Sequence, residues 1–179
     1  MCRSQCYNHL CRKFNICFSS IAGQTNVYRT ISFFVRLSRA MTLNKNSIVK
    51  FDEASVNEGN HFNPGDGIFV SPVSGTYQFS WTTLTITGKL AETELMVDNV
   101  VKDTLHNSLG AGTISGTKVV LCKVKKGDHV WIQTSNVYGT NTFVVANGNA
   151  KSSFTGMLIH IHILERKTLQ KLNYKCIPW

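Results

Sequence analysis

The sequence lacks long hydrophobic runs, periodic glycine and, almost entirely, proline. Only 3 of its 179 residues are proline, and its 13 glycines do not recur at every third position, which excludes a collagen stalk within the chain. No apolar run approaches the roughly 20 residues of a membrane-spanning helix, so no transmembrane segment is expected. With 42% hydrophobic and 16% charged residues, the chain is predicted to be one globular domain with appended ends.

Motifs for catalysis are also missing. The sequence contains no H-E-x-x-H, no G-x-S-x-G and no phosphate-binding glycine loop. Residues 112–116, G-T-I-S-G, have the wrong spacing for a nucleophile elbow, and no two acidic residues stand out as a general acid and base. We therefore predict that the protein is not an enzyme and requires no cofactor.

The net charge of +9 lies entirely in the two ends of the chain. Residues 1–39 contain six basic and no acidic residues, residues 160–179 contain four basic and one acidic, and residues 40–159 contain nine of each. A nucleic-acid domain needs basic side chains gathered on its folded surface. Because the central segment is neutral, and its one basic cluster at residues 123–126 fits a strand end and turn, no nucleic-acid partner is expected.

Four of the six cysteines fall in the first seventeen residues, at Cys2, Cys6, Cys11 and Cys17. Their spacing matches no zinc pattern, and disulfides among them would require an oxidising compartment. The first twenty residues lack the apolar core of a secretory signal. We therefore treat residues 1–30 as a Cys-rich basic segment without an assigned fold and residues 161–179 as a basic extension, and their disulfide state and export route stay open.

Between these ends the pattern is all-β. Short apolar or alternating runs recur, each closed by Gly, Pro, Asn or Asp, with no run of helical spacing and caps. The strands expected are residues 31–39, 47–51, 67–70, 76–87, 92–97, 100–105, 112–124, 129–135, 142–146 and 153–163. About ten antiparallel strands with polar outer faces predict a two-sheet sandwich or jelly roll.

The clearest strand is residues 76–87, in which Tyr77, Phe79 and Trp81 share one face. We expect these rings to point into the core. Gly75, after the turn that contains Pro72, is expected to adopt a positive φ. A second turn at residues 126–128 is expected to place Trp131 near the core.

The last expected strand has no polar face. Alternation divides it into two apolar sets, Met157, Ile159, Ile161 and Ile163 on one side, and Leu158, His160, His162 and Leu164 on the other. Residues 31–35 are similarly apolar. Since one face of a strand meets the opposite sheet, the second apolar face predicts contact with another protein chain, so both strands are candidate subunit-interface elements.

Residues 51–81 carry a specific arrangement of aromatic, asparagine and glycine positions. Its members, at spacings of five, four, six and five intervening residues and then within one strand, are Phe51, Asn57, Phe62, Phe69, Gly75, Tyr77, Phe79 and Trp81. The arrangement resembles the signature of the globular C1q domain, and residues 48–51, 119–132 and 153–159 extend the resemblance over about residues 31–160. The last aromatic position of that signature is usually Phe or Tyr, and here it is Trp81.

The resemblance implies a ten-stranded jelly roll like that of tumour necrosis factor, assembled as a homotrimer. It also implies an extracellular, secreted recognition protein of the collagen-free type found in bivalve molluscs, where such proteins look like innate-immune lectins. Several relatives bind calcium, so calcium is a possible ligand although none is required. Binding of microbial surfaces or glycans is the first functional hypothesis; the alternative is a secreted signalling or adhesion ligand of a cell-surface receptor. A third reading, an intracellular binding protein, follows only from the missing signal peptide.

Candidate ligand-binding residues lie in polar loops that carry a ring. Sugars are bound by amide and hydroxyl groups together with stacking on a ring, and the residues that supply this chemistry are Asn136, Tyr138, Asn141, His106 and Asn107. Ordinary hairpin turns explain the same asparagines.

Two metal sites are conceivable. Asp98 and Asp103, with Asn99 and Asn107, are oxygen donors in one loop-rich stretch and are the calcium candidates, although turn formation explains them equally well. His160 and His162 are two residues apart, so they share a strand face and are potential zinc or copper ligands. Without a third ligand nearby in sequence, two ordinary histidines at a strand end remain the alternative.

Overall fold

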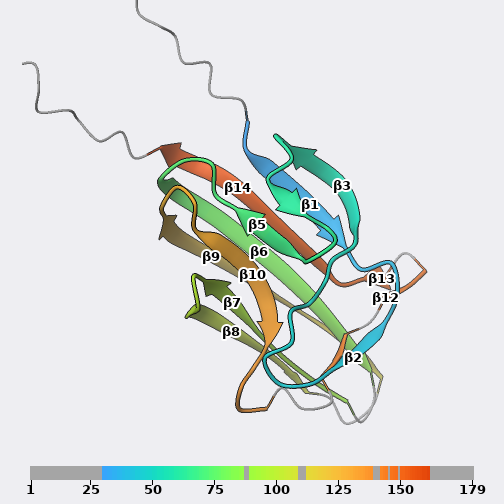
Figure 1. Ribbon diagram of the computed structural model, residues 1–179. Helices are drawn as coiled ribbons and strands as arrows, with labels where there is room; N and C mark the ends of the chain where they lie inside the picture. Colours follow the sequence, from blue (N-terminus) through green and yellow to red (C-terminus); the bar gives the residue numbers. More distant parts are fainter. Residues whose placement is uncertain are drawn as a thin grey trace, which may run out of the picture.

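The computed structural model describes residues 30–86, 89–108, 112–138, 142–144, 146–148 and 150–161. These residues form strands and turns, and none of them forms a helix that would reach across a membrane. Two five-stranded antiparallel sheets enclose a single hydrophobic core (Figure 1). The all-β, two-sheet jelly roll predicted from the sequence is confirmed.

Sheet I contains the first and last long strands side by side. Its order is β3-β1-β14-β6-β9, with bounds Glu53–Glu58, Ser32–Arg36, Ser153–Ile161, Gly75–Ile86 and Thr113–Val124. Sheet II has the order β4-β5-β10-β7-β8, with bounds Phe62–Asn63, Ile68–Val70, His129–Thr134, Leu90–Val97 and Val100–Ser108. Two short pairs flank the sheets: β2 (Met41–Leu43) with β11 (Thr142–Val144), and β12 (Ala146–Asn147) with β13 (Ala150–Lys151).

Aromatic rings from both sheets fill the core. Tyr77, Phe79 and Trp81 on β6 are fully buried, as the alternation predicted, and Phe51, Phe62 and Phe69 pack in the same cluster. The indole Nε1 of Trp81 donates a hydrogen bond to Thr93 Oγ1 at 3.0 Å, which links sheet I to β7 of sheet II. A buried indole therefore has the polar partner that it needs.

Asn57 joins two backbone groups across a loop. Its Nδ2 donates to the carbonyl of Phe62 at 2.8 Å, and its Oδ1 accepts from the Phe62 N–H at 3.1 Å. Because both backbone groups of Phe62 are bound in this way, the ring is fixed as the chain enters β4. This contact is the physical reason for the four-residue interval between Asn57 and Phe62.

Gly75 differs from its sequence-based interpretation. It is not among the glycines with positive φ. A Cβ atom at this position would lie 2.5 Å from the carbonyl oxygen of His160 and 2.6 Å from Leu158 Cδ1. Glycine is thus required by the close approach of β14 to the start of β6, and the prediction of a left-handed backbone there was wrong.

The prediction of a β-strand at residues 47–51 is also wrong. Only an isolated bridge from Ile48 to Gln133 forms there, with separate backbone hydrogen bonds such as Val49 N–H to the Ile132 carbonyl at 2.8 Å. Val49 and Phe51 are nevertheless buried. The apolar alternation of residues 47–51 therefore indicated which side chains are buried and did not indicate a hydrogen-bonded strand. The strand of sheet I lies just beyond, at β3, whose sequence is polar and mostly exposed and carries no alternating signal.

Trp131 is buried, but outside the core cluster. The turn before it has Gly127 at φ 90° and leads from β9 into β10, as predicted. On β10, Val130 and Ile132 face the core, so Trp131 lies on the outer face of sheet II, opposite Met96 of β7. Trp131 is therefore buried close to the core, as expected, but it packs on the outer face of sheet II and not within the central cluster.

A β-bulge interrupts the predicted two-faced strand. The pairing of β14 with β6 shifts between Leu158 and His160, so strict alternation ends at Ile159. Met157 and Ile159 are exposed and Leu158 packs against the core. His160 is exposed, and the predicted division into two alternating faces does not continue through the shift; residues 162–164 lie outside the described residues.

Replacement of Trp81 tests the core. Trp81→Ala is expected to lower the free energy of unfolding by about 3–5 kcal/mol, because it leaves a cavity and removes the donor to Thr93. Urea denaturation measures the change. Tyr138→Ala, at an exposed position, is the matched control and is expected to change stability by about 0.5 kcal/mol or less. Equal effects of the two substitutions would contradict the assignment of Trp81 to the core.

Candidate functional site

The outer face of sheet II carries buried acidic groups. On β7, Leu95 and Val97 face the core, while Glu92, Glu94 and Met96 alternate onto the outer face and are still buried. Long side chains on the flanking strands cover them, because Glu92 lies opposite His106 of β8, and Glu94 lies opposite Gln133 of β10. A central strand with covered carboxylates on its outer face is the starting point of the site.

Glu92 and His106 form the closest polar contact of this face. His106 Nδ1 lies 2.6 Å from Glu92 Oε2, and the His106 side chain is 51% exposed whereas that of Glu92 is 9% exposed. The carboxylate therefore holds the imidazole from below while the far side of the ring remains open to solvent. Glu92 acts here as a positioning group for an exposed ring.

The loop after β10 completes the same arrangement. Ser135 donates its backbone N–H to the Glu92 carbonyl at 3.0 Å, and Ser135 Oγ accepts from the Val137 N–H at 3.0 Å. Burial by itself raises the pKa of Glu92, but hydrogen bonds from the Ser135 and His106 side chains, the charge of His106 and the Tyr138 backbone N–H together lower it below its ordinary value. The Glu92 carboxylate is thus ionised at neutral pH and anchors β8 and the loop.

Tyr138 and His106, two of the residues singled out from the sequence, are neighbours. Their ring centroids are 6.4 Å apart at 85°, in an edge-to-face arrangement, and Tyr138 is 60% exposed. Asn136 lies in the same loop, where its Oδ1 accepts from Asn46 Nδ2 at 3.4 Å. We call the surface formed by Glu92, His106, Ser135, Asn136 and Tyr138 the ring surface.

A row of hydrogen-bonded side chains lies beside the ring surface. Trp131 Nε1 donates to Gln133 Oε1 at 3.0 Å, and Gln133 Nε2 donates to Glu94 Oε2 at 3.4 Å. The first hydrogen bond lies within β10, and the second joins β10 to β7, so the buried polar groups of this row have partners. The row fixes Trp131 against Met96 and gives the ring surface a rigid base.

Asn107 does not join the exposed rings. It is buried, and its Nδ2 donates to the Thr83 carbonyl at 2.7 Å and to Thr83 Oγ1 at 2.8 Å. Its amide therefore links β8 to β6 inside the sandwich. The remaining candidate, Asn141, lies outside the described residues.

The two calcium candidates occupy separate places. Asp98 is in the hairpin turn between β7 and β8, where a hydrogen bond from the His129 backbone N–H lowers the pKa of its carboxyl. Asp103 lies within β8, where Lys118 Nζ at 2.8 Å lowers the pKa of that carboxyl. Each carboxylate thus already has its own donor, His129 N–H for Asp98 and Lys118 Nζ for Asp103, and the two share no hydrogen-bond partner among the described residues.

The described part of the chain contains no cluster of three or more His, Cys, Asp or Glu side chains suited to a metal ion. His160 belongs to this part, and His162 does not. Cys122 is a free thiol on β9, where burial raises its pKa, and the four amino-terminal cysteines lie outside the described residues.

The outer face of sheet I has the opposite character. Leu121 of β9, Gln78 of β6 and Met157 of β14 lie in one row across three strands. Leu121 is 64% exposed, and the other exposed apolar side chains of this face are Val119, Ile159 and Val56. We call this set the aliphatic face. Exposed apolar groups gathered on one sheet are typical of a protein–protein contact.

Comparison with known proteins decides the family. The family profile of the C1q domain matches residues 32–159, which includes both sheets except for the last two residues of β14. The chain belongs to the C1q-domain family. Members are non-enzymatic proteins of immune recognition or signalling, so the predictions of family and of a non-enzymatic protein are confirmed, and C1q-domain relatives are mostly secreted.

Individual relatives are distant. The chain is 28% identical over 134 residues to the heavy metal-binding protein HIP of Mytilus edulis, covering 73% of this chain and 61% of that protein. It is 30% identical over 113 residues to human complement C1q tumor necrosis factor-related protein 2, covering 63% of this chain and 39% of that protein. The C1q domain described here thus spans less than two thirds of the length of these relatives.

Solved structures share the fold. The globular domain of zebrafish complement 1qA superposes with a TM-score of 0.58 at 17% identity, covering 74% of this chain and 99% of that chain. The Eiger TNF of S. frugiperda superposes with a TM-score of 0.61 at 10% identity, covering 79% and 99% respectively. The C1q and tumour necrosis factor domains therefore share this jelly roll.

Sequence reasoning missed Glu92 and Ser135 as parts of the ring surface. The signal was present in the residues 92–94, Glu-Thr-Glu, where two acids occupy one face of an otherwise apolar strand. A carboxylate on a central strand needs a partner on the neighbouring strands. The identity of that partner depends on the register of β7 with β8, which only the structure gives.

Substitution of Glu92 is expected to have a pH-dependent effect. Because the folded-state pKa of Glu92 is lowered, folding favours the ionised form. The resulting stabilisation is complete above the unfolded-state pKa, near about 4.3, and is lost as the pH falls through the folded-state value. Glu92→Gln is therefore expected to lower the free energy of unfolding by about 1–2 kcal/mol at neutral pH.

Urea denaturation of both proteins at neutral and at acidic pH measures this difference. The two curves are expected to converge as the pH falls below about 4. If the difference in free energy of unfolding between the wild type and Glu92→Gln is the same at both pH values, the charge of the Glu92 carboxylate contributes nothing to stability.

Proposed function

We propose that this C1q domain is a secreted, homotrimeric recognition protein that binds carbohydrate on microbial surfaces through the ring surface. The observation that carries the proposal is the exposed edge-to-face pair of Tyr138 and His106, which Glu92 holds in place. Sugars pack their apolar faces on rings and satisfy their hydroxyls with imidazole, amide and hydroxyl groups. The ring surface combines these groups on sheet II and the loop that follows β10.

The aliphatic face supports assembly. Leu121, Val119 and Ile159 are more than half exposed in the single chain; Ile159 lies on β14, and Leu121 and Val119 lie on β9, the edge strand of the same sheet. Burying them against further copies of the chain removes apolar surface from water. Since the ring surface belongs to the other sheet, assembly through the aliphatic face leaves three ring surfaces free to act together.

Disruption of the aliphatic face tests the trimer. Leu121→Glu is expected to convert the trimer into a monomer, because three carboxylates would have to be buried at the contact. Sedimentation equilibrium measures the mass. Val100→Glu is the matched control, because Val100 is also exposed but lies in the β7–β8 hairpin of sheet II, and this variant is expected to remain trimeric.

A wild-type protein that sediments as a monomer would refute the assembly proposal. The measurement is to be repeated with a chelator. An unchanged mass is expected, because we propose that no calcium ion is needed to hold the subunits together.

Substitutions in the ring surface test ligand binding. Tyr138→Ala and His106→Ala are each expected to weaken binding to bacterial cells and to a glycan array by about tenfold or more. Val101→Ala, an exposed substitution on β8 away from the rings, is the control and is expected to bind as the wild type does. If the wild type binds and neither Tyr138→Ala nor His106→Ala weakens that binding, the ligand site lies outside the ring surface.

A receptor ligand is the second candidate function. Val137, next to Tyr138, is 61% exposed, and an apolar side chain beside a ring is typical of a protein contact. The relative named as tumor necrosis factor-related points in the same direction. Capture of a cell-surface protein that persists in excess free glycan favours this function over carbohydrate recognition.

A further inference from the structure

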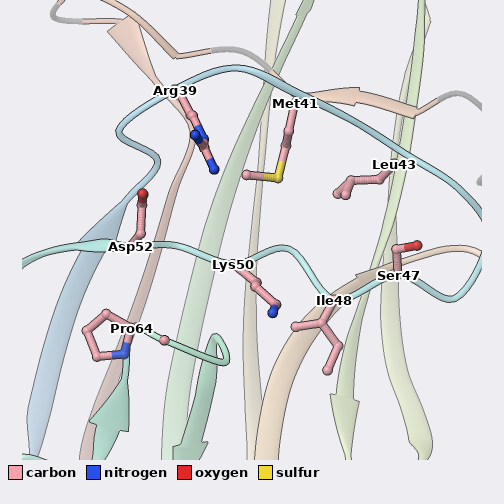
Figure 2. A pocket seen from close by; sticks show the side chains of 9 residues that line it. Arg39, Met41, Leu43, Ser47, Ile48, Lys50, Asp52 and Pro64 are labelled. Carbon is pink, nitrogen blue, oxygen red and sulfur yellow. The ribbon is translucent and has the colours of Figure 1, made fainter.

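A cavity of about 660 Å³ lies beside the sandwich, and none of its lining residues belongs to the ring surface or to the aliphatic face. Figure 2 shows Arg39, Met41 and Leu43 projecting from one segment toward a second segment that carries Ile48 and Lys50. None of the lining residues belongs to a strand of sheet I. Assembly through the aliphatic face therefore leaves the cavity open.

The walls of this cavity are fixed before any ligand binds. Met41 and Leu43 pack partly against the hydrophobic core, and their strand β2 pairs with β11. The opposite segment is tied to β10 by the hydrogen bond from Thr134 N–H to the Ser47 carbonyl at 2.9 Å. A preformed concave site binds a small molecule without the entropy loss of ordering its walls.

The lining has an apolar floor and a cationic rim. The apolar side chains are those of Met41, Leu43, Ile48 and Pro64, and the cations are Arg39 and Lys50. Among the described residues, neither cation forms a salt bridge. Lys50 is thus an uncompensated charge at the edge of an apolar surface.

Asp52 does not neutralise both cations. Its Oδ1 accepts from the Ser38 N–H at 2.8 Å, and its Oδ2 accepts from Ser38 Oγ at 2.5 Å. Two cations and one carboxylate leave the lining with a net charge of +1. The site therefore favours a ligand that carries one negative charge.

We propose that this cavity binds a small anionic amphiphile, with an acyl body on the Met41, Leu43 and Ile48 floor and a carboxylate head at Arg39 and Lys50. The volume lies within the roughly 300–1,000 Å³ typical of small-molecule sites, which is enough for a medium-length acyl chain. An apolar body gains from burial, and a charged head beside a guanidinium and an ammonium forms charge-assisted hydrogen bonds. This site is separate from the proposed carbohydrate site and does not depend on it.

Methionine methyl resonances give a reporter at each surface. Met41 lines the cavity, Met157 belongs to the aliphatic face and Met96 lies beneath Trp131. With the full chain labelled at its methionine methyl groups, titration with octanoate is expected to shift the Met41 resonance and leave those of Met96 and Met157 in place. Octanol is expected to bind about tenfold more weakly, and octylammonium and acetate are expected to cause no shift.

Charge-removing variants assign the head group. Arg39→Gln and Lys50→Gln are each expected to weaken octanoate binding about fivefold and to leave octanol binding unchanged. Lys45→Gln removes the same charge from an exposed position on the same loop outside the cavity and is the matched control, with no change expected. Equal binding of octanoate and octylammonium, or octanoate shifts at Met157 instead of Met41, would overturn the proposal, as would the absence of any shift at Met41.

Discussion

The structure depends on one contact, in which the ring of Phe33 lies over a glycine. Phe33 on β1 is paired with Gly156 on β14, and a Cβ at Gly156 would lie 2.3 Å from Phe33 Cε1 and 2.8 Å from Phe79 Cε1. The missing side chain lets rings from β1 and β6 meet across the central strand. Phe62 and Phe69 of sheet II then pack on Phe33, at centroid distances of 4.8 and 5.1 Å. The two sheets are joined at this point.

Because rings seal the interior, the two outer faces are free to differ. Sheet I presents aliphatic side chains such as Leu121, with small polar groups between them, whereas sheet II presents carboxylates held by His106, Ser135 and Gln133. One face is suited to contact with copies of the chain and the other to polar ligands. The proposed separation of assembly on one face from recognition on the other follows from which residues alternate outward on each sheet.

Sequence reasoning succeeded where burial alone determines the pattern. The inward-facing rings of β6 and the family signature could be predicted from the sequence, because large aromatic side chains at fixed spacings are stable only in the core. It failed where pairing decides: β3 has no apolar alternation, and a β-bulge interrupts the alternation of β14 at Ile159. The ring surface shares this limit, since the contact of His106 with Tyr138 joins a strand to a distant loop.

The buried amide of Asn107 has a consequence for how this domain can vary among relatives. Gly116 lies beside it, and a Cβ at Gly116 would sit 2.0 Å from Asn107 Oδ1. The amide can bond Thr83 only while position 116 has no side chain. The two positions are therefore physically coupled: a larger residue at position 116 would displace the Asn107 amide, so we expect relatives to change both together although eight residues lie between them along the chain.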